Sequence, residues 1–154
     1  MSFHNLEKAL ELAPKCKFYT TAGGVSNECI RRSEEMLGLK FSKQCRHFYE
    51  KCGYLSFFGT EVFGIDPDDL DTLEGNSVAY ALNDREEYGL PNNWLPIYNF
   101  DEGELAYLDF GNLNKENEPP VISCYYDGTG YEEPEVIAED FGAFLLHLVE
   151  EALE

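Results

Sequence analysis

The sequence predicts one α+β domain with a mostly antiparallel sheet, N-terminal helices and a C-terminal amphipathic helix packed on the sheet. The chain has 154 residues, the size of one domain. Helical periodicity occurs near both ends, and short strand-like segments separated by glycine turns lie between them. This order, without strict βαβ alternation, favours antiparallel pairing. The domain is expected over residues 1–152, and Leu153-Glu154 matches an expression-tag remnant.

Three helices are expected in the first third of the chain. Apolar residues on one face predict the first helix over residues 3–12. Ser26 is positioned to cap the second helix, and Gly38 to end it. Ser42 is positioned to cap the third, which closes at Gly53. Because only three residues join the second and third helices, these two should pack on each other.

A hairpin is expected where the helical character ends. The strand-like residues 54–58 and 61–65 flank Gly59 and Thr60, which predicts a turn at that pair. A short helical turn should follow over residues 66–70, with its first aspartate as the cap and a proline in its first turn.

The remaining elements alternate between helix, strands and a final helix. A fourth helix is predicted over residues 77–88, and strands over 95–100, 105–109 and 121–126. Residues 15–25 have no regular pattern. The last helix is the clearest prediction, because its large apolar residues recur every three or four positions. This stripe contains Phe141, Phe144, Leu145, Leu148, Val149 and Ala152.

Charge separates the chain into two parts. The net charge is -19. Residues 1–53 hold nine Lys/Arg against six Asp/Glu, a balance of +3, whereas residues 54–154 hold two against twenty-four, a balance of -22. Such a surface repels nucleic acid and anionic membranes, so neither is expected as a partner. Two interpretations stay open: the acids keep a small domain soluble, or they steer a basic protein partner into contact.

Cysteine usage and targeting signals favour a cytoplasmic protein. The number of cysteines is odd and no C-x-x-C pair occurs, so we expect five reduced thiols and no zinc site. Neither a long apolar run nor a basic start followed by an apolar stretch is present, so no membrane span or secretory signal is expected. The cysteines are Cys16, Cys29, Cys45, Cys52 and Cys124.

No residue pattern predicts catalysis or a cofactor, so we expect a binding protein and not an enzyme. The aspartates of residues 66–71 lack the ligand spacing of a calcium loop and are expected to cap turns. Carboxylates of residues 101–109 leave a carboxylate-based hydrolase as an alternative, although turns commonly use such residues. His47 and His147 are expected to be structural. Trp94 fits either a core anchor or a partner contact.

Acids on turns and short helices are the candidates for contact with a basic partner, because their side chains reach solvent there. The predicted partner-binding residues are Asp66, Asp68, Asp69, Asp71, Glu86, Glu87, Asp101, Glu102, Glu104, Glu132 and Glu133.

Several segments in order resemble the SUKH superfamily. One departure is Phe41-Ser42, where members usually carry Leu-Pro at the start of the third helix. The segments are IRRSEEMLGLKF (30–41), FGTEVFGI (58–65), PNNWLPI (91–97), DEGELAYLD (101–109) and IAEDFGAFL (137–145).

This resemblance implies an α+β fold and an immunity protein that neutralises the RNase domain of a secreted toxin. Such a domain must attract RNA and is therefore expected to be basic, so an acidic protein could block its active site. A regulatory or scaffold module without a toxin is the alternative that the resemblance leaves open. A homodimer is also left open.

Overall fold

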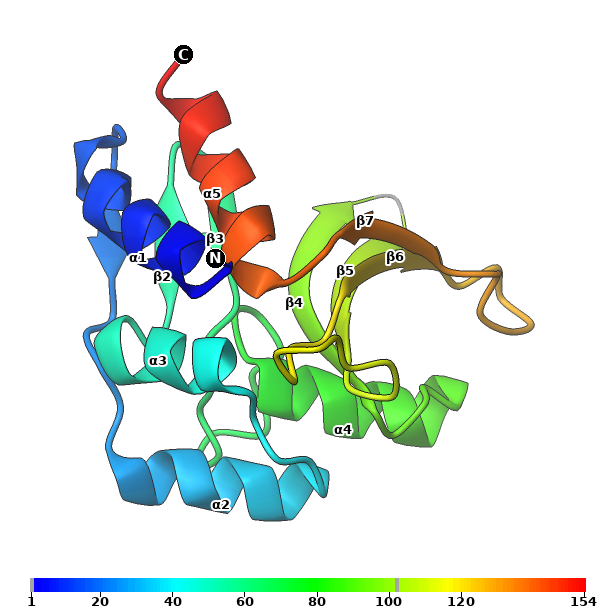
Figure 1. Cartoon of the computed structure of the whole chain (residues 1–154). Coiled ribbons are helices and arrows are strands. Elements are labelled where there is room, and N and C mark those ends of the chain that lie inside the picture. Colours follow the sequence, from blue (N-terminus) through cyan, green and yellow to red (C-terminus); the bar gives the residue numbers. More distant parts are fainter. Residues whose placement is uncertain (1, 102) are drawn as a thin grey trace.

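The computed structural model describes residues 2–101 and 103–154, and Figure 1 shows their arrangement. One antiparallel sheet runs through the molecule, and each strand pairs with the next strand in the sequence. The predicted α+β fold with an antiparallel sheet is therefore confirmed. The strands are β1 (Thr20–Thr21), β2 (Leu55–Phe57), β3 (Thr60–Val62), β4 (Trp94–Asp101), β5 (Glu104–Asp109), β6 (Val121–Tyr125) and β7 (Glu135–Ala138).

The helices form where caps and apolar spacing predict them. The Ser26 hydroxyl accepts a hydrogen bond from the Cys29 N–H at 3.1 Å, and Gly38 ends that helix with a φ of 68°. The Ser42 hydroxyl likewise accepts from the Cys45 N–H at 3.3 Å. The helices are α1 (Ser2–Leu12), the 3₁₀ helix η1 (Ala13–Lys15), α2 (Asn27–Leu37), α3 (Lys43–Lys51), α4 (Ser77–Tyr88) and α5 (Phe141–Ala152).

Helices from both ends of the chain pack together over the core. Helix α1 lies beside α5 (Figure 1), and the predicted stripe of α5 is largely buried. The Phe141 ring of α5 meets Phe48 of α3 with centroids 5.0 Å apart. A large apolar side chain that is fully buried in this way contributes roughly 1.5–3 kcal/mol. The sheet core and these three helices thus form one continuous apolar cluster.

Helix α4 lies across β4 and spans the residues predicted for it. No helix in the described part of the chain combines the length and the apolar composition needed to cross a membrane.

The β2–β3 hairpin differs from the sequence prediction by one residue. Phe57 pairs with Thr60, so the turn consists of Phe58 and Gly59, and Thr60 belongs to the strand. Both turn residues have positive φ, 43° and 78°. This is the geometry of a type I′ turn, whose twist matches that of the flanking strands. The prediction of Gly59-Thr60 as the turn was wrong because it made Gly59 the first turn residue, whereas Gly59 is the second and Phe58 the first.

Two further local predictions were wrong, whereas the end of α3 was predicted correctly. Residues 66–70 form turns and no helix, although the Asp66 carboxylate accepts the Asp68 N–H at 3.2 Å as a cap would. Helix α3 ends at Lys51, and Gly53, with a φ of 62°, closes it as predicted. The segment expected to be irregular, 15–25, contains the two-residue edge strand β1 and begins at the last residue of η1. The opposite edge strand, β7, was not predicted either.

Candidate partner-binding surface

The acidic loop, which we define as residues 66–76, precedes helix α4 and is held by one buried amide. The Asn76 Oδ1 accepts from the Asp66 N–H at 3.2 Å, and its Nδ2 donates to the carbonyl oxygens of Asp66 at 3.0 Å and Asp69 at 2.8 Å. The same Oδ1 caps α4 by accepting the Val78 N–H at 3.2 Å. Asn76 therefore fixes the loop against the helix while the aspartate side chains reach solvent.

Nine of the eleven predicted acids are exposed. Asp68 is already paired, because its Oδ1 lies 2.7 Å from Nη2 of Arg32. Glu104 is half-buried in β5, and Glu102 lies outside the described residues. The exposed acids are Asp66, Asp68, Asp69, Asp71, Glu86, Glu87, Asp101, Glu132 and Glu133.

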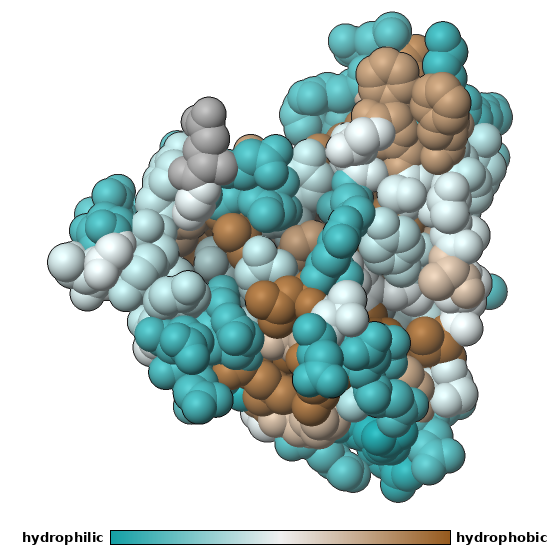
Figure 2. Space-filling model, turned by 180° about the vertical axis from the view of Figure 1, so that it is seen from behind, coloured by the Kyte–Doolittle hydropathy of each residue, from teal (hydrophilic) through white to brown (hydrophobic). Residues whose placement is uncertain are grey.

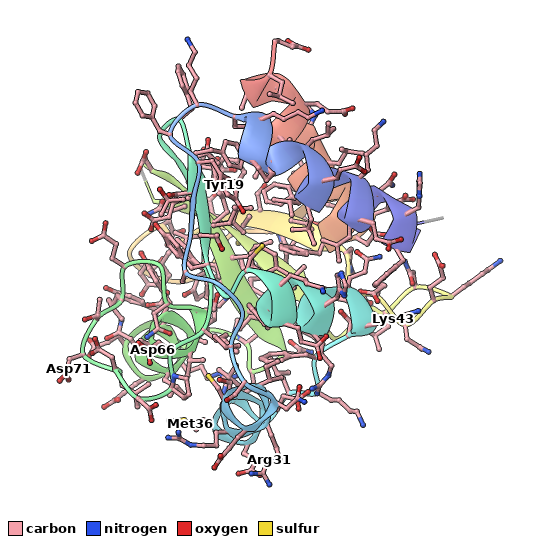
Figure 3. The ribbon with its side chains drawn as sticks, turned by 90° about the vertical axis from the view of Figure 1, so that its left-hand side faces the viewer. Tyr19, Arg31, Met36, Lys43, Asp66 and Asp71 are labelled. Carbon is pink, nitrogen blue, oxygen red and sulfur yellow. The ribbon has the colours of Figure 1, made fainter. Side chains whose placement is uncertain are left out.

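The acidic loop lies beside helix α2, because Asp68 of the loop pairs with Arg32 of that helix. In Figure 3, Asp66 and Asp71 lie on the acidic loop at one side, whereas Lys43 lies at the start of α3 on the other. Arg31 points outward from α2 (Figure 3). Lys43 and the acidic loop thus lie apart, whereas α2 brings a basic residue to the edge of the loop.

A cavity of about 500 Å³ lies beside the acidic loop, and we call it the aromatic-acid cavity. Carboxylates of Glu61, Glu74 and Asp101 line it together with aromatic rings. The rings of Phe63 and Tyr80 are stacked with centroids 5.4 Å apart. On the face seen in Figure 2, apolar side chains lie in hollows between hydrophilic ones. This combination suits a cationic side chain, because aromatic faces and carboxylates both attract positive charge.

A second cavity, of about 280 Å³, lies between α4, β5 and the connection from β6 to β7. We call it the tyrosine cavity. Asp84 lines it and is only 6% exposed. Burial raises the pKa of this carboxyl group, an effect that a hydrogen bond from the side chain of Asn83 partly offsets. The tyrosines that line it are Tyr80, Tyr88, Tyr107, Tyr126 and Tyr131.

The tyrosine cavity was missed by the sequence analysis, although one signal for it was present. Tyr80, Asp84 and Tyr88 recur at four-residue steps and therefore share one face of α4. A helix face that carries two tyrosines and one aspartate is unusual for a core-facing stripe. The other tyrosines could not be assigned to the same place without the fold, since they come from β5 and from residues 126–131.

Aromatic residues are also exposed at the β2–β3 hairpin. Phe18 and Phe58 are 80% and 60% exposed, both have positive φ, and both line one shallow depression. The Phe58 N–H donates to the Lys17 carbonyl oxygen at 3.0 Å and so holds the two segments together. Bulky residues rarely adopt this backbone conformation. The exposed rings are therefore a second candidate for partner contact.

The five cysteines are free, and four of them are buried. Burial raises the pKa of Cys45 and Cys124, which keeps these thiols protonated.

The two histidines expected to be structural both have partners. His47 packs edge-on against Phe3 with ring centroids 5.0 Å apart, and the Nε2 of His147 lies 3.1 Å from a carboxylate oxygen of Glu151.

Trp94 begins β4 and is partly buried. Its ring lies 5.4 Å from that of Tyr107 and 6.0 Å from that of Tyr131. These contacts favour the interpretation of Trp94 as a core anchor, and they also make it a supporting wall behind the tyrosine cavity.

Two of the carboxylates that left a hydrolase open as an alternative lie on either side of the β4–β5 turn. Asp101 and Glu104 are register partners, with Asp101 exposed at a φ of 75°. Among the described residues, no group of three or more His, Cys, Asp or Glu side chains could hold a metal ion.

A family model described as SMI1-KNR4 cell-wall, SUKH_5, matches residues 6–150, which is nearly the whole chain. The chain belongs to the SUKH family. The resemblance that the ordered segments indicated is thereby confirmed at the level of the superfamily. SUKH domains include immunity proteins of toxin systems and are in general binding domains without enzymatic activity. No curated protein matches the chain, so no single member of the family serves as a guide to its partner.

Proposed function

We propose that this protein is an immunity protein that binds a basic toxin domain and blocks its active site. The observations that carry the proposal are the excess of acids in residues 54–154 of a SUKH domain and the two cavities lined by carboxylates and aromatic rings. A nuclease domain must attract a polyanion, so its active site is expected to be basic. An RNase domain of a secreted toxin is therefore the partner we propose, bound in the bacterial cytoplasm.

Charge and aromatic side chains would have separate roles in this complex. Acids at the rim accelerate the encounter of oppositely charged proteins. Tyrosine and tryptophan are enriched among the few residues that dominate binding free energy. The acidic loop would therefore set the rate of association, and the aromatic cavities would set the rate of dissociation.

The test is capture from the native strain followed by a functional assay. The tagged protein should retain a toxin with a nuclease domain, and that purified domain should stop cleaving RNA when one equivalent of the protein is added. A captured partner without nuclease activity would instead favour a regulatory or scaffold role. RNA cleavage that continues at saturating protein would contradict active-site blocking.

A further inference from the structure

The tyrosine cavity contains a buried carboxylate without a cationic partner. In residues 2–101 and 103–154, no Lys or Arg forms an ion pair with Asp84, and the hydrogen bond to its side chain comes from Asn83 at 3.0 Å. The adjacent Arg85 donates from Nη2 to the Asn92 carbonyl oxygen at 2.7 Å. A carboxylate removed from water is costly unless it is paired, so this position favours binding of a cation.

The walls of the cavity select the kind of cation. The Tyr88 and Tyr126 rings lie 4.6 Å apart, and Tyr126 lies 5.1 Å from Tyr131. Tyr107 closes the inner side with its ring 6.4 Å from that of Tyr131. Burial raises the pKa of both Tyr107 and Tyr131, so these phenols stay neutral and can accept or donate hydrogen bonds. A planar, weakly hydrated guanidinium stacks on such rings better than an ammonium group does.

The size and opening of the cavity fit one side chain. Its volume of about 280 Å³ is just below the range of pockets that hold drug-sized ligands. Tyr88 is 46% exposed and stands at the mouth, whereas Asp84 is 6% exposed at the base. A long side chain that enters past Tyr88 would therefore bring a terminal charge to Asp84.

We propose that the tyrosine cavity receives the guanidinium group of an arginine that the basic partner presents, with Asp84 as its counter-ion and Tyr88 and Tyr126 as its stacking surfaces. This inference rests on the proposed function, because it assumes a basic protein partner. It goes further in naming the residue type that the partner must insert and the place where it binds.

The experiment measures binding of a small probe to the whole protein. N-acetyl-arginine amide is titrated into the ¹⁵N-labelled chain at low salt and followed by NMR, with the uncharged N-acetyl-citrulline amide as the matched ligand. We expect a dissociation constant on the order of 1 mM, with the largest shifts at Asn83, Asp84 and Tyr88. The citrulline probe should bind at least about tenfold more weakly than the arginine probe.

Two variants separate the cavity from general acidity. Asp84→Asn keeps the side-chain shape and should weaken arginine-probe binding about tenfold or more, whereas Glu139→Gln removes an exposed charge elsewhere and should leave it unchanged. Tyr88→Ala should weaken binding, and Tyr88→Phe should preserve it. Equal affinity of wild type and Asp84→Asn, or shifts confined to the acidic loop, would overturn the inference.

The inference and the proposed function can fail separately. If the arginine probe binds at Asp84 but no nuclease is inhibited, the cavity is an arginine site and the proposed function is wrong. If the Asp84→Asn variant still inhibits the toxin domain, and its complex dissociates at the wild-type rate, the immunity function stands and the assignment of the cavity is wrong.

Discussion

Glu34 and Arg46 join helices α2 and α3 by an ion pair whose Oε1 and Nη2 atoms lie 2.9 Å apart. The other carboxylate oxygen of Glu34 accepts the Phe41 N–H at 2.7 Å, in the short link between the helices. The Glu34 side chain is only 15% exposed, so it connects two partners where water has little access. One residue thus fixes both the link and the contact between the helices.

Truncating the Glu34 side chain should therefore destabilise the fold more than neutralising its charge does. Glu34→Ala leaves the Phe41 N–H and Arg46 without their partner and should lower the free energy of unfolding by about 1–3 kcal/mol. Glu34→Gln keeps an acceptor for the N–H and loses only the charge, so it should cost about 1 kcal/mol, less than Glu34→Ala. Urea denaturation of the two variants and wild type measures the difference. Equal losses would mean that the hydrogen bond to Phe41 contributes nothing.

Asp84→Asn should stabilise the free protein. The wild-type carboxylate is buried without a cation, and an amide of the same shape avoids the cost of that charge. We expect a gain of about 0.5–2 kcal/mol at neutral pH, as is common when a residue kept for function is replaced. Thermal and urea unfolding measure it, with Glu139→Gln as the control. A destabilised Asp84→Asn variant would show that the carboxylate has a structural role.

Stability should rise as the pH falls from neutral toward mildly acidic values. Burial raises the pKa of Asp84 and of Glu118 above their ordinary values of 3.8 and 4.5, so the folded protein binds these protons more tightly than the unfolded chain. Their contribution is fully present below the ordinary values and is lost as pH rises through the folded pKa. Urea denaturation between about pH 4.5 and 8 tests this. Asp84→Asn should flatten the curve, and an unchanged slope would contradict the assignment.

Phe58→Asn should stabilise the β2–β3 hairpin. Asparagine followed by glycine is a preferred pair for a type I′ turn, whereas a bulky residue with positive φ is strained by roughly 1–2 kcal/mol. Because the Phe58 ring is 60% exposed, little burial is lost, and a gain of about 1 kcal/mol is expected. Phe58→Ala removes the ring but keeps the strain, so it should give no such gain. If Phe58→Asn also weakens toxin binding, the strained ring is a partner contact.

Association with the toxin domain should depend on salt and on the acidic loop. Encounter rates between oppositely charged proteins rise from about 10⁵–10⁶ to 10⁸–10⁹ M⁻¹s⁻¹ at low salt. The double variant Asp69→Asn, Asp71→Asn should slow association at low salt, whereas Glu7→Gln, Glu11→Gln, in the part of the chain with a positive balance, should not. Stopped-flow mixing across a salt series measures both. An on-rate that is independent of salt would mean that the acids serve solubility only.

The sequence predicts elements well where local signals decide them and poorly where the fold decides them. Helix α4 was placed correctly because Gly89, with Pro91 just beyond it, marks where the helix ends. Strands β1 and β7 were missed because β1 has two residues and β7 is mostly exposed on both faces, so neither shows alternation. The Phe58 turn was displaced because a phenylalanine with positive φ is exceptional.

In the candidate site too, residues marked by local signals could be predicted, and residues that only the fold brings together could not. The acids of the surface could be selected from the sequence, because turns predict exposure. Asp84 was not selected, because a carboxylate within a helical pattern is normally on the solvent face. Only the packing of α4 against β5 and residues 126–131 turns that side chain into the base of a cavity.

The contact between α1 and α5 has a consequence for synthesis of the protein. Neighbouring strands of the sheet are also neighbours in sequence, so the strands can pair as they leave the ribosome. Helix α5 follows every strand of the sheet in the chain, and until it emerges α1 lacks its main packing partner. We therefore expect the nascent chain to complete its core only once α5 has emerged, so that a ribosome stalled before Phe141 carries a collapsed sheet and a first helix without its main partner.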